Sequence, residues 1–353
     1  METPYVLIDI VKLQDNINKM ATFAASNGLK LRPHVKAHKL PEIARMQIDA
    51  GAQGITVATL TEAEVMFSAG IRDILVAYPL IGESKMARAA ALLNRGCQLS
   101  FLVDSYYGAH QVSGLGTPGG TSVLVKVDSG LGRCGYTPGK DLEDFVCWLC
   151  HQPNLNFKGL LTHAGHAYSC SSSDAVARVG IEEGKLMVAT ATALRRQGIA
   201  VAEVSIGSTP TVSWGGKIPG VTEIRPGNYV FNDATQVALG VVGKERCSLK
   251  VVSTVVSRPA PDRAIIDAGA KVLALDQGAH GGGAVSGYGL LANPCWRLSR
   301  LSEEHGIIHG KDLPEIGEII EVIPNHACPV VNLTDTVYTS NGLEWRVAAR
   351  GRV

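Results

Sequence analysis

The chain has no excess of charge of either sign, and it has few charged and few aromatic residues. Its 353 residues include 33 lysines and arginines against 32 aspartates and glutamates, a formal net charge of +1. Charged residues make up 18% of the chain and aromatic residues 5%. This balance argues against a partner nucleic acid or an anionic membrane surface. The low charge content also predicts that a partner chain covers part of the surface.

Export signals and membrane spans are missing as well. The N-terminus lacks a basic stretch followed by a long apolar run, so we expect no signal peptide. No run approaches 18 apolar residues, so we expect no membrane span. The eight cysteines lack the spacing of a disulfide framework, which favours reduced thiols in a cytoplasmic protein. Cys147 and Cys150 form a CxxC pair among apolar neighbours, and we interpret them as small residues of a buried helix rather than a redox or zinc pair.

Short apolar runs alternate with helical segments through the first two thirds of the chain. Several runs are apolar on both faces, which is typical of parallel strands that are covered on both sides. The runs that predict strands are residues 29–35, 54–58, 73–77, 98–103, 122–127, 157–162, 202–206 and 222–230. Eight such units predict an α/β fold, a (β/α)8 TIM barrel over residues 10–240. A doubly wound sheet is the alternative, but its GxGxxG phosphate fingerprint is missing after an early strand.

The pattern changes after about residue 240. Strand-like runs follow one another with loops between them and no long helical pattern, at residues 248–257, 263–267, 318–323, 336–339 and 345–348. This texture predicts a second, mostly-β domain over residues 241–353, to which we assign the N-terminal strand within residues 1–9. The glycine-rich segments 281–283 and 287–289 are expected to be loops, either at the barrel mouth or as connectors.

Polar residues gather where the predicted barrel strands end, which is where barrel enzymes carry their chemistry. Lys36 follows the first strand, and small residues with free N–H groups follow the last two strands, as in barrel phosphate sites. The other candidates at these strand ends are Arg133, His163, His166, Tyr168, Ser208, Thr209, Arg225, Gly227, Asn228 and Tyr229. Each residue alone is more often a surface or core residue, but their joint placement predicts a phosphorylated cofactor. Covalent attachment through Lys36 would suit pyridoxal 5′-phosphate (PLP).

Several of these segments resemble those of a known enzyme family nearly end to end. RPHVKAHK, VKVDSGLGRCG, GLLTHAGHAY, SIGST and EIRPGNYVFND are similar to segments of the alanine-racemase-type (fold-type III) PLP enzymes. RPHVKAHK and PNHACPVVN resemble the branch of D-threonine aldolases and eukaryotic-type D-serine dehydratases. The resemblance implies an alanine racemase-like barrel with a C-terminal β domain.

The resemblance also implies a role for each matching residue. Lys36 would hold PLP, Arg133 would contact its phenolate oxygen, and His163 would lie beside its pyridine ring. Arg225 or Tyr168 would face the ring nitrogen. The residues implied at the phosphate are Ser208, Thr209, Gly227, Asn228 and Tyr229.

Two residues near the C-terminus are candidate metal ligands. His326 and Cys328 stand two positions apart after the apolar run 318–323, so a strand there would point both side chains to one face. An imidazole and a thiolate can hold a divalent ion and leave positions open for water and substrate. The resemblance implies that this pair binds the metal of the branch. Cysteine favours Zn²⁺, whereas an oxygen-rich site would favour Mn²⁺ or Mg²⁺, and the sequence leaves the ion open.

The resemblance implies a lyase whose small-molecule substrate is a D-3-hydroxy amino acid. We favour retro-aldol cleavage of the Cα–Cβ bond, as in D-threonine aldolases, with His166 or a metal-activated water as the base. The alternative is dehydration of D-serine or D-3-hydroxyaspartate with loss of ammonia, in which Lys36 removes the Cα proton. Racemisation is disfavoured because His38 and Lys39 occupy the neighbourhood in which the racemases carry a phosphate-binding tyrosine.

Two other classes of function remain open. A PLP-binding homeostasis protein with little turnover uses the same barrel, but such relatives lack the additional β domain. A metal-dependent barrel hydrolase without PLP is the third interpretation. In this fold the β domain of one subunit commonly approaches the barrel mouth of another, which implies a homodimer with the active site near the subunit interface.

Overall fold

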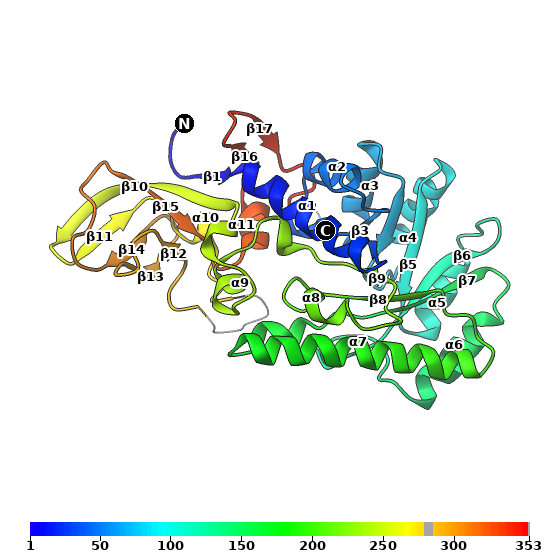
Figure 1. Cartoon of the computed structure of the whole chain (residues 1–353). Coiled ribbons are helices and arrows are strands. Elements are labelled where there is room, and N and C mark those ends of the chain that lie inside the picture. Colours follow the sequence, from blue (N-terminus) through cyan, green and yellow to red (C-terminus); the bar gives the residue numbers. More distant parts are fainter. Residues whose placement is uncertain (279–284, 352–353) are drawn as a thin grey trace.

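The computed structural model describes residues 1–278 and 285–351, which form two sheets side by side (Figure 1). One sheet consists of eight parallel strands and the other of nine strands, most of them from the C-terminal third. The predicted loop 281–283 lies outside the described residues. The last strand of the parallel sheet ends at Ile224 and the first strand of the C-terminal third begins at Leu249. We therefore propose that the domain boundary falls near residue 240, as the sequence predicts.

The parallel sheet curls into a barrel in the order β2-β9-β8-β7-β6-β5-β4-β3. Its two edge strands meet through a single parallel β-bridge between His34 and Thr56. His34 follows β2, and Thr56 lies within β3. The strands are β2 (Lys30–Leu31), β3 (Ile55–Val57), β4 (Asp73–Val76), β5 (Gln98–Val103), β6 (Thr121–Lys126), β7 (Leu155–Leu161), β8 (Glu203–Ile206) and β9 (Glu223–Ile224). The predicted strand 222–230 is thus much shorter than expected, because Pro226 and Gly227 interrupt it and residues 228–230 form a 3-10 turn.

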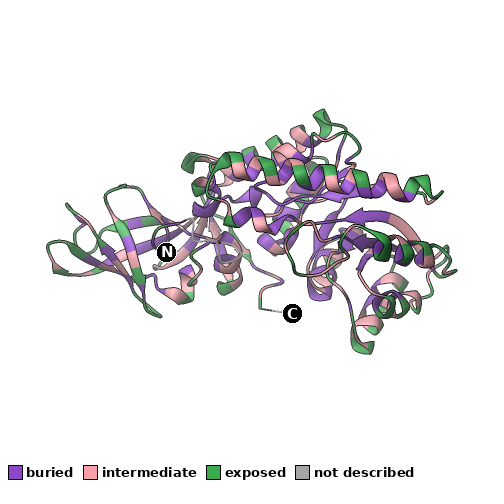
Figure 2. Cartoon of the chain, turned by 90° about the horizontal axis from the view of Figure 1, so that it is seen from below, coloured by how far each residue is buried: buried purple, intermediate pink, exposed green. Residues whose placement is uncertain are grey.

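Helices cover the outside of the barrel, and their buried residues face the strands (Figure 2). The helices are α1 (Ile10–Ser26), α2 (Pro41–Asp49), α3 (Leu60–Ser68), α4 (Glu83–Asn94), α5 (Tyr106–Ser113), α6 (Lys140–Cys150), α7 (Ser173–Arg196) and α8 (Val212–Gly215). A further helix, α9 (Ala234–Ala238), begins with backbone hydrogen bonds to the segment after β15 instead. Cys147 and Cys150 lie on α6 with exposed side chains, so the expectation that they are buried is wrong. No helix among the described residues is long and apolar enough to cross a membrane.

A small layer of leucines divides the inside of the barrel. Leu75, Leu102, Leu124 and Leu161 from four neighbouring strands pack together and are nearly inaccessible to solvent. Two of them, Leu102 and Leu161, face a cavity at the C-terminal ends of the strands. The other two, Leu75 and Leu124, face a cavity at the opposite end. The layer therefore closes the barrel between two separate polar openings.

The second sheet is mostly antiparallel. β1 (Tyr5–Ile8) pairs with β10 and with β16, so the N-terminal strand belongs to this sheet. The other strands are β10 (Leu249–Ala260), β11 (Arg263–Ile266), β12 (Leu290–Leu291), β13 (Arg297–Leu301), β14 (Gly306–His309), β15 (Ile319–Ile323), β16 (Thr336–Thr339) and β17 (Glu344–Arg346). The sequence predicted neither β12 nor β13–β14. Two short helices complete this part, α10 (Ala270–Leu273) and α11 (Ala327–Leu333).

Candidate active site

A cavity of about 890 Å³ lies at the C-terminal end of the barrel, between the barrel strands and α11. It brings together predicted residues that are as much as 292 positions apart in the chain, from Lys36 to Cys328. The predicted residues that line it are Lys36, Arg133, His163, Tyr168, Ser208, Thr209, Arg225, Gly227, Asn228, His326 and Cys328. The candidate cofactor lysine and the candidate metal pair therefore share one cavity.

Two predicted residues do not line this cavity. His166 follows β7, and its side chain packs against Gly130 in the loop that follows β6. The hydroxyl of Tyr229 accepts a hydrogen bond from Gln47 at 3.0 Å, in the core between α2 and the second sheet. Only the backbone of Tyr229 serves the site, because its N–H donates to Thr209 Oγ1.

Lys36 sits in the 3-10 turn Val35–Ala37, directly after β2. The imidazole of His34 accepts a hydrogen bond from the backbone N–H of Lys36, which fixes the start of this turn. Burial lowers the pKa of Lys36, and the nearby Arg133 and Arg225 lower it further, although Cys328 opposes them. A lowered pKa increases the neutral fraction of the amine, which is the form that attacks an aldehyde and accepts a proton.

The imidazoles beside Lys36 are held neutral. Burial lowers the pKa of both His34 and His163, and the positive charges of Lys36 and Arg225 lower both further. His163 Nδ1 lies 3.3 Å from the carbonyl oxygen of Gly207, at the end of β8. This part of the cavity therefore combines neutral rings with cationic side chains.

The turns after β8 and β9 form a cradle of backbone N–H groups. Among the described residues, no acceptor is found for the N–H groups of Thr209, Gly227 and Asn228. The Oδ1 atom of Asn228 is buried and also lacks a partner. A side chain at position 227 would come within 2.9 Å of the carbonyl oxygen of His34, so glycine lets the turn after β9 pack closely against the segment that carries Lys36. An oxyanion such as a phosphate fits these donors.

His326 and Cys328 reach the cavity from the start of a helix rather than from a strand end. β15 ends at Ile323, His326 is the N-cap residue of α11, and Cys328 is the second residue of that helix. The prediction that a strand aligns the two side chains is therefore wrong. Both residues nevertheless line the same cavity.

Asp276 orients His326, and the sequence analysis missed it. The Nδ1–H of His326 donates to Asp276 Oδ2 at 2.9 Å, and the imidazole also shares a hydrogen bond with the side chain of Cys328. Burial alone would lower the pKa of His326, but Cys328 and Asp276 raise it to about 10. Asn325 Nδ2 donates to the carbonyl oxygen of Asp276 at 3.0 Å and so holds the aspartate in place. No periodicity or motif surrounds position 276 that could have indicated this role.

No group of three or more histidine, cysteine, aspartate or glutamate side chains in the described residues is arranged to hold a metal ion. The pair of His326 and Cys328 would thus supply two protein ligands. Water and substrate would have to complete the coordination of an ion there.

Lys126 is another cavity residue that the sequence analysis did not single out. It ends β6 and is almost fully buried. Burial lowers its pKa to about 8, and the positive charge of Arg225 acts in the same direction. A signal was present, because Lys126 is the one charged residue in an otherwise apolar strand.

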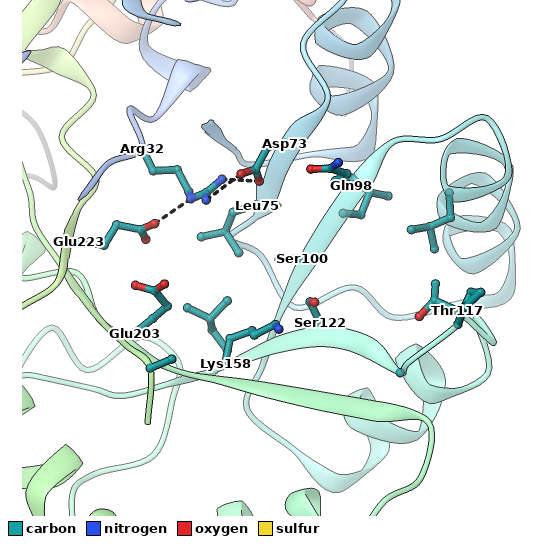
Figure 3. A pocket seen from close by; sticks show the side chains of 16 residues that line it. Arg32, Asp73, Leu75, Gln98, Ser100, Thr117, Ser122, Lys158, Glu203 and Glu223 are labelled. Atoms are coloured by element: carbon teal, nitrogen blue, oxygen red, sulfur yellow. Dashed lines mark hydrogen bonds and ion pairs between the residues drawn. The ribbon is translucent and has the colours of Figure 1, made fainter. Parts of the chain in front are cut away.

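A second cavity of about 500 Å³ lies at the N-terminal end of the barrel (Figure 3). Arg32 lies between two carboxylates there, at 2.6 Å from Asp73 and 2.8 Å from Glu223. Burial alone would lower the pKa of Arg32, but these carboxylates raise it above its ordinary value. Glu203, which also lines the cavity, pairs with Lys30. Nearly every charge at this end is therefore already paired within the protein.

Two family descriptions together match most of the chain. "Alanine racemase, N-terminal domain" matches residues 8–235, and "Putative serine dehydratase domain" matches residues 248–340. The chain is 34% identical to a D-threo-3-hydroxyaspartate dehydratase of Delftia sp., over 93% of this chain and 91% of that protein. It is 32% identical to a D-threonine aldolase of Arthrobacter sp, over 99% of this chain and 93% of that protein.

Solved structures agree with this assignment. The D-threonine aldolase from Filomicrobium marinum superposes with a TM-score of 0.90 at 29% identity, over 100% of this chain and 97% of that one. A cysteine-to-alanine variant of a D-threo-3-hydroxyaspartate dehydratase, described as being in the metal-free form, superposes with a TM-score of 0.90 at 31% identity, over 98% of this chain and 97% of that one. The chain therefore belongs to the alanine-racemase-type (fold-type III) PLP enzymes, in the branch of D-threonine aldolases and D-serine dehydratases, and it is a PLP-dependent lyase.

Proposed function

We propose that this lyase depends on a divalent metal as well as on PLP, and that its substrates are D-3-hydroxy amino acids. One observation carries the proposal: Lys36, His326 and Cys328 line the same cavity at the barrel mouth. A substrate bound through its amine near Lys36 could therefore present its β-hydroxyl to an ion near the His326–Cys328 pair. The similarity to a D-threo-3-hydroxyaspartate dehydratase and a D-threonine aldolase supports this substrate class.

The residues present fit PLP. The lowered pKa of Lys36 suits an amine that condenses with the cofactor aldehyde, and the N–H groups of Thr209, Gly227 and Asn228 suit its phosphate. Arg225 is held in place by Ser205 at 2.8 Å and by the carbonyl oxygen of Thr162. When bound, PLP supplies an electron sink that stabilises negative charge at Cα.

The residues present also fit a metal ion. The Nε2 of His326 and the thiol of Cys328 would hold it in place of the hydrogen bond between their side chains, and Asp276 would fix the orientation of the imidazole. A thiolate ligand favours Zn²⁺ over Mn²⁺ or Mg²⁺. The ion would supply Lewis acidity at the β-hydroxyl. The description of a cysteine-to-alanine variant of a D-threo-3-hydroxyaspartate dehydratase as metal-free supports a metal in that relative.

The positions of the candidate bases favour dehydration. Lys36 Nζ is a base inside the cavity that could accept the Cα proton, and its lowered pKa suits that role. The proton from Cα and the hydroxyl from Cβ would leave as water, and a water molecule would then hydrolyse the resulting 2-imino acid to a 2-oxo acid and ammonia. Arg133, His163 and Arg225 would keep the cofactor in place during this step.

Retro-aldol cleavage, which the sequence analysis favoured, is the second candidate. It needs a base at the β-hydroxyl rather than at Cα. His166, one predicted base, does not line the cavity, so a metal-activated water is the remaining candidate. The full-length similarity to D-threonine aldolases is the observation that supports this outcome.

Product analysis distinguishes the two reactions. The protein, loaded with PLP and separately with Zn²⁺ or Mn²⁺, is incubated with D-threonine, D-serine and D-threo-3-hydroxyaspartate, with and without EDTA. Dehydration gives ammonia with 2-oxobutanoate, pyruvate or oxaloacetate, whereas cleavage gives glycine with an aldehyde. EDTA should abolish either activity. A PLP-loaded, metal-loaded protein that turns over none of the three substrates would contradict the proposal.

We further propose that the protein is a cytoplasmic homodimer whose active site lies near the subunit interface. Tyr78 and Ile81, which line the cavity rim, are 53% and 40% exposed, and apolar side chains at such a rim suit coverage by a second subunit. All eight cysteines are free thiols, in keeping with a reducing compartment. Light scattering coupled to size-exclusion chromatography would give twice the mass of one chain, and a monomeric mass would contradict the dimer.

A further inference from the structure

The cavity at the barrel mouth has an uneven charge. Five cationic side chains line it, and among the described residues no aspartate or glutamate does; the five are Lys36, Lys85, Lys126, Arg133 and Arg225. Such a cavity attracts anionic groups. Three anionic groups meet in such a cavity whatever the substrate: the phosphate and the phenolate oxygen of the cofactor, and the α-carboxylate of the amino acid.

The two acidic residues that act on Lys36 and Lys126 from outside the cavity lining, Glu62 and Glu183, offset this charge only in part, because each is also engaged elsewhere. Glu183 accepts hydrogen bonds from Ala164 N–H at 3.0 Å and from Thr211 Oγ1 at 3.0 Å. Glu62 pairs with Lys39 at 3.0 Å, on the outer side of the turn that carries Lys36. The cations of the cavity therefore remain available to bound ligands.

Lys85 lies on the side of the mouth that is farthest from the cofactor cradle. In the closed strand order, β4 stands four strands from β8 in both directions, so the two strands are opposite each other across the barrel. The cradle follows β8 and β9, whereas Lys85 belongs to α4, which follows β4. A substrate group that points away from the cofactor phosphate can thus extend toward Lys85.

The local structure does not account for a lysine at this position. Lys85 is the third residue of α4, where the positive end of the helix dipole disfavours a cation. Its ammonium has no ion pair or hydrogen bond among the described residues, and its one recorded contact is with the ring of Tyr78, 5.8 Å from the centroid. The side chain is half-buried at the cavity rim.

We propose that Lys85 determines substrate specificity by binding a carboxylate carried on Cβ, so that the preferred substrates are dicarboxylic D-3-hydroxy amino acids. This inference rests on the proposed function, because it concerns the substrate of that same site. The α-carboxylate and the cofactor would be bound by the other four cations of the cavity, which lie at or after the ends of β2, β6 and β9 rather than β4. The second carboxylate then finds in Lys85 a cation that no protein group neutralises. Substrates with a methyl group or hydrogen at Cβ make no such contact.

Steady-state kinetics with two substrates test this role. In the PLP- and metal-loaded wild type, kcat/KM for D-threo-3-hydroxyaspartate should exceed that for D-threonine. Lys85→Met keeps the length of the side chain and removes the charge. It should lower kcat/KM for the dicarboxylate about 10- to 100-fold, mainly through a higher KM, because a hydrogen bond to a charged group is lost. The value for D-threonine should change less than about two-fold.

Two further variants guard against trivial explanations. Lys85→Arg should restore most of the preference, since it restores the cation. Lys158→Met removes a lysine from the opposite end of the barrel and should leave both substrates unchanged. An unchanged PLP absorbance spectrum shows that each variant is folded and loaded.

The possible failures are distinguishable. Equal losses for both substrates in Lys85→Met, or a wild type that prefers D-threonine, would overturn the role of Lys85 and leave the proposed function intact. A wild type that turns over neither substrate would overturn both.

Discussion

The two ends of the barrel have similar polar side chains but opposite degrees of charge pairing. At the N-terminal end, Arg32 is paired with Asp73 and Glu223, and Glu203 is paired with Lys30 (Figure 3). At the C-terminal end, Lys36, Arg133 and Lys85 line a cavity without any acidic lining residue in the described part of the chain. The leucine layer of β4–β7 separates the two. The ion pairs at the N-terminal end stabilise the fold, whereas the cationic side chains around the C-terminal cavity are available to bind an anionic ligand.

This difference separates stability from function. Substitutions at the paired end should change the free energy of unfolding and leave catalysis unchanged. Substitutions at the open end should change cofactor binding, metal binding or specificity and have little effect on unfolding.

Lys36→Ala should have the largest effect. Without the amine, the protein cannot hold PLP covalently or move the Cα proton, so kcat/KM should fall by at least about 1,000-fold. The absorbance band of lysine-bound PLP should also disappear. The melting temperature of the apo forms should be the same for the variant and the wild type. A yellow, active Lys36→Ala protein would contradict the assignment of the cofactor lysine.

Arg32→Met should affect the paired end alone. Removing the guanidinium leaves the buried Glu223 carboxylate without its cation, which we expect to cost about 3 kcal/mol in the free energy of unfolding. Denaturant titration measures this loss. Lys158→Met is the control at the same end, because Lys158 has no ion-pair partner among the described residues and should cost less than about 0.5 kcal/mol. A change in kcat for folded Arg32→Met would contradict the separation of the two ends.

Asp276→Asn should weaken metal binding. The amide no longer accepts the His326 Nδ1–H as a carboxylate does, so the imidazole loses its fixed orientation and part of its basicity. We expect a 10- to 100-fold higher Kd for Zn²⁺, measured by competition with a chelating dye, and an unchanged PLP spectrum. Equal Zn²⁺ affinity in variant and wild type would show that Asp276 plays no part in metal binding.

The pH dependence of cofactor uptake should be the smallest effect. Only the neutral amine of Lys36 attacks the PLP aldehyde, so uptake slows as the pH falls through the pKa of Lys36. Because burial lowers that pKa, the rate should decline at a lower pH than it does for an exposed lysine. Stopped-flow absorbance on the apoprotein, with Nα-acetyl-lysine as the reference amine, measures the shift. An identical pH profile for the two amines would contradict a lowered pKa.

The sequence predicted a residue's location best where the residue type and its position after a strand both indicated the same site. The place of Lys36 at the barrel mouth could be predicted because a lysine directly follows an apolar strand, and the spacing of the other strand ends placed the turns after β8 and β9 at the same cavity. The alternation of apolar runs was sufficient to predict eight barrel strands. Their lengths were less predictable, as in β9, where Pro226 and Gly227 end the strand early.

Contacts between distant segments could not be predicted. Asp276 orients His326 across 50 positions, and no local pattern records that contact. His326 and Cys328 line the same cavity, but the start of a helix rather than a strand brings them there. His166 follows the right strand, but its ring packs on Gly130 instead of entering the cavity. Side-chain direction at a loop depends on such packing, which spacing alone does not reveal.

X-ray diffraction from crystals loaded with PLP and Zn²⁺, collected at the zinc absorption edge, tests the shared cavity most directly. The account predicts continuous electron density from Lys36 Nζ to the cofactor and one anomalous peak bonded to both His326 Nε2 and Cys328 Sγ in the same cavity. The zinc should lie about 2.3 Å from the sulfur and about 2.0 Å from the nitrogen. An anomalous peak elsewhere in the molecule, or PLP attached to another lysine, would contradict it.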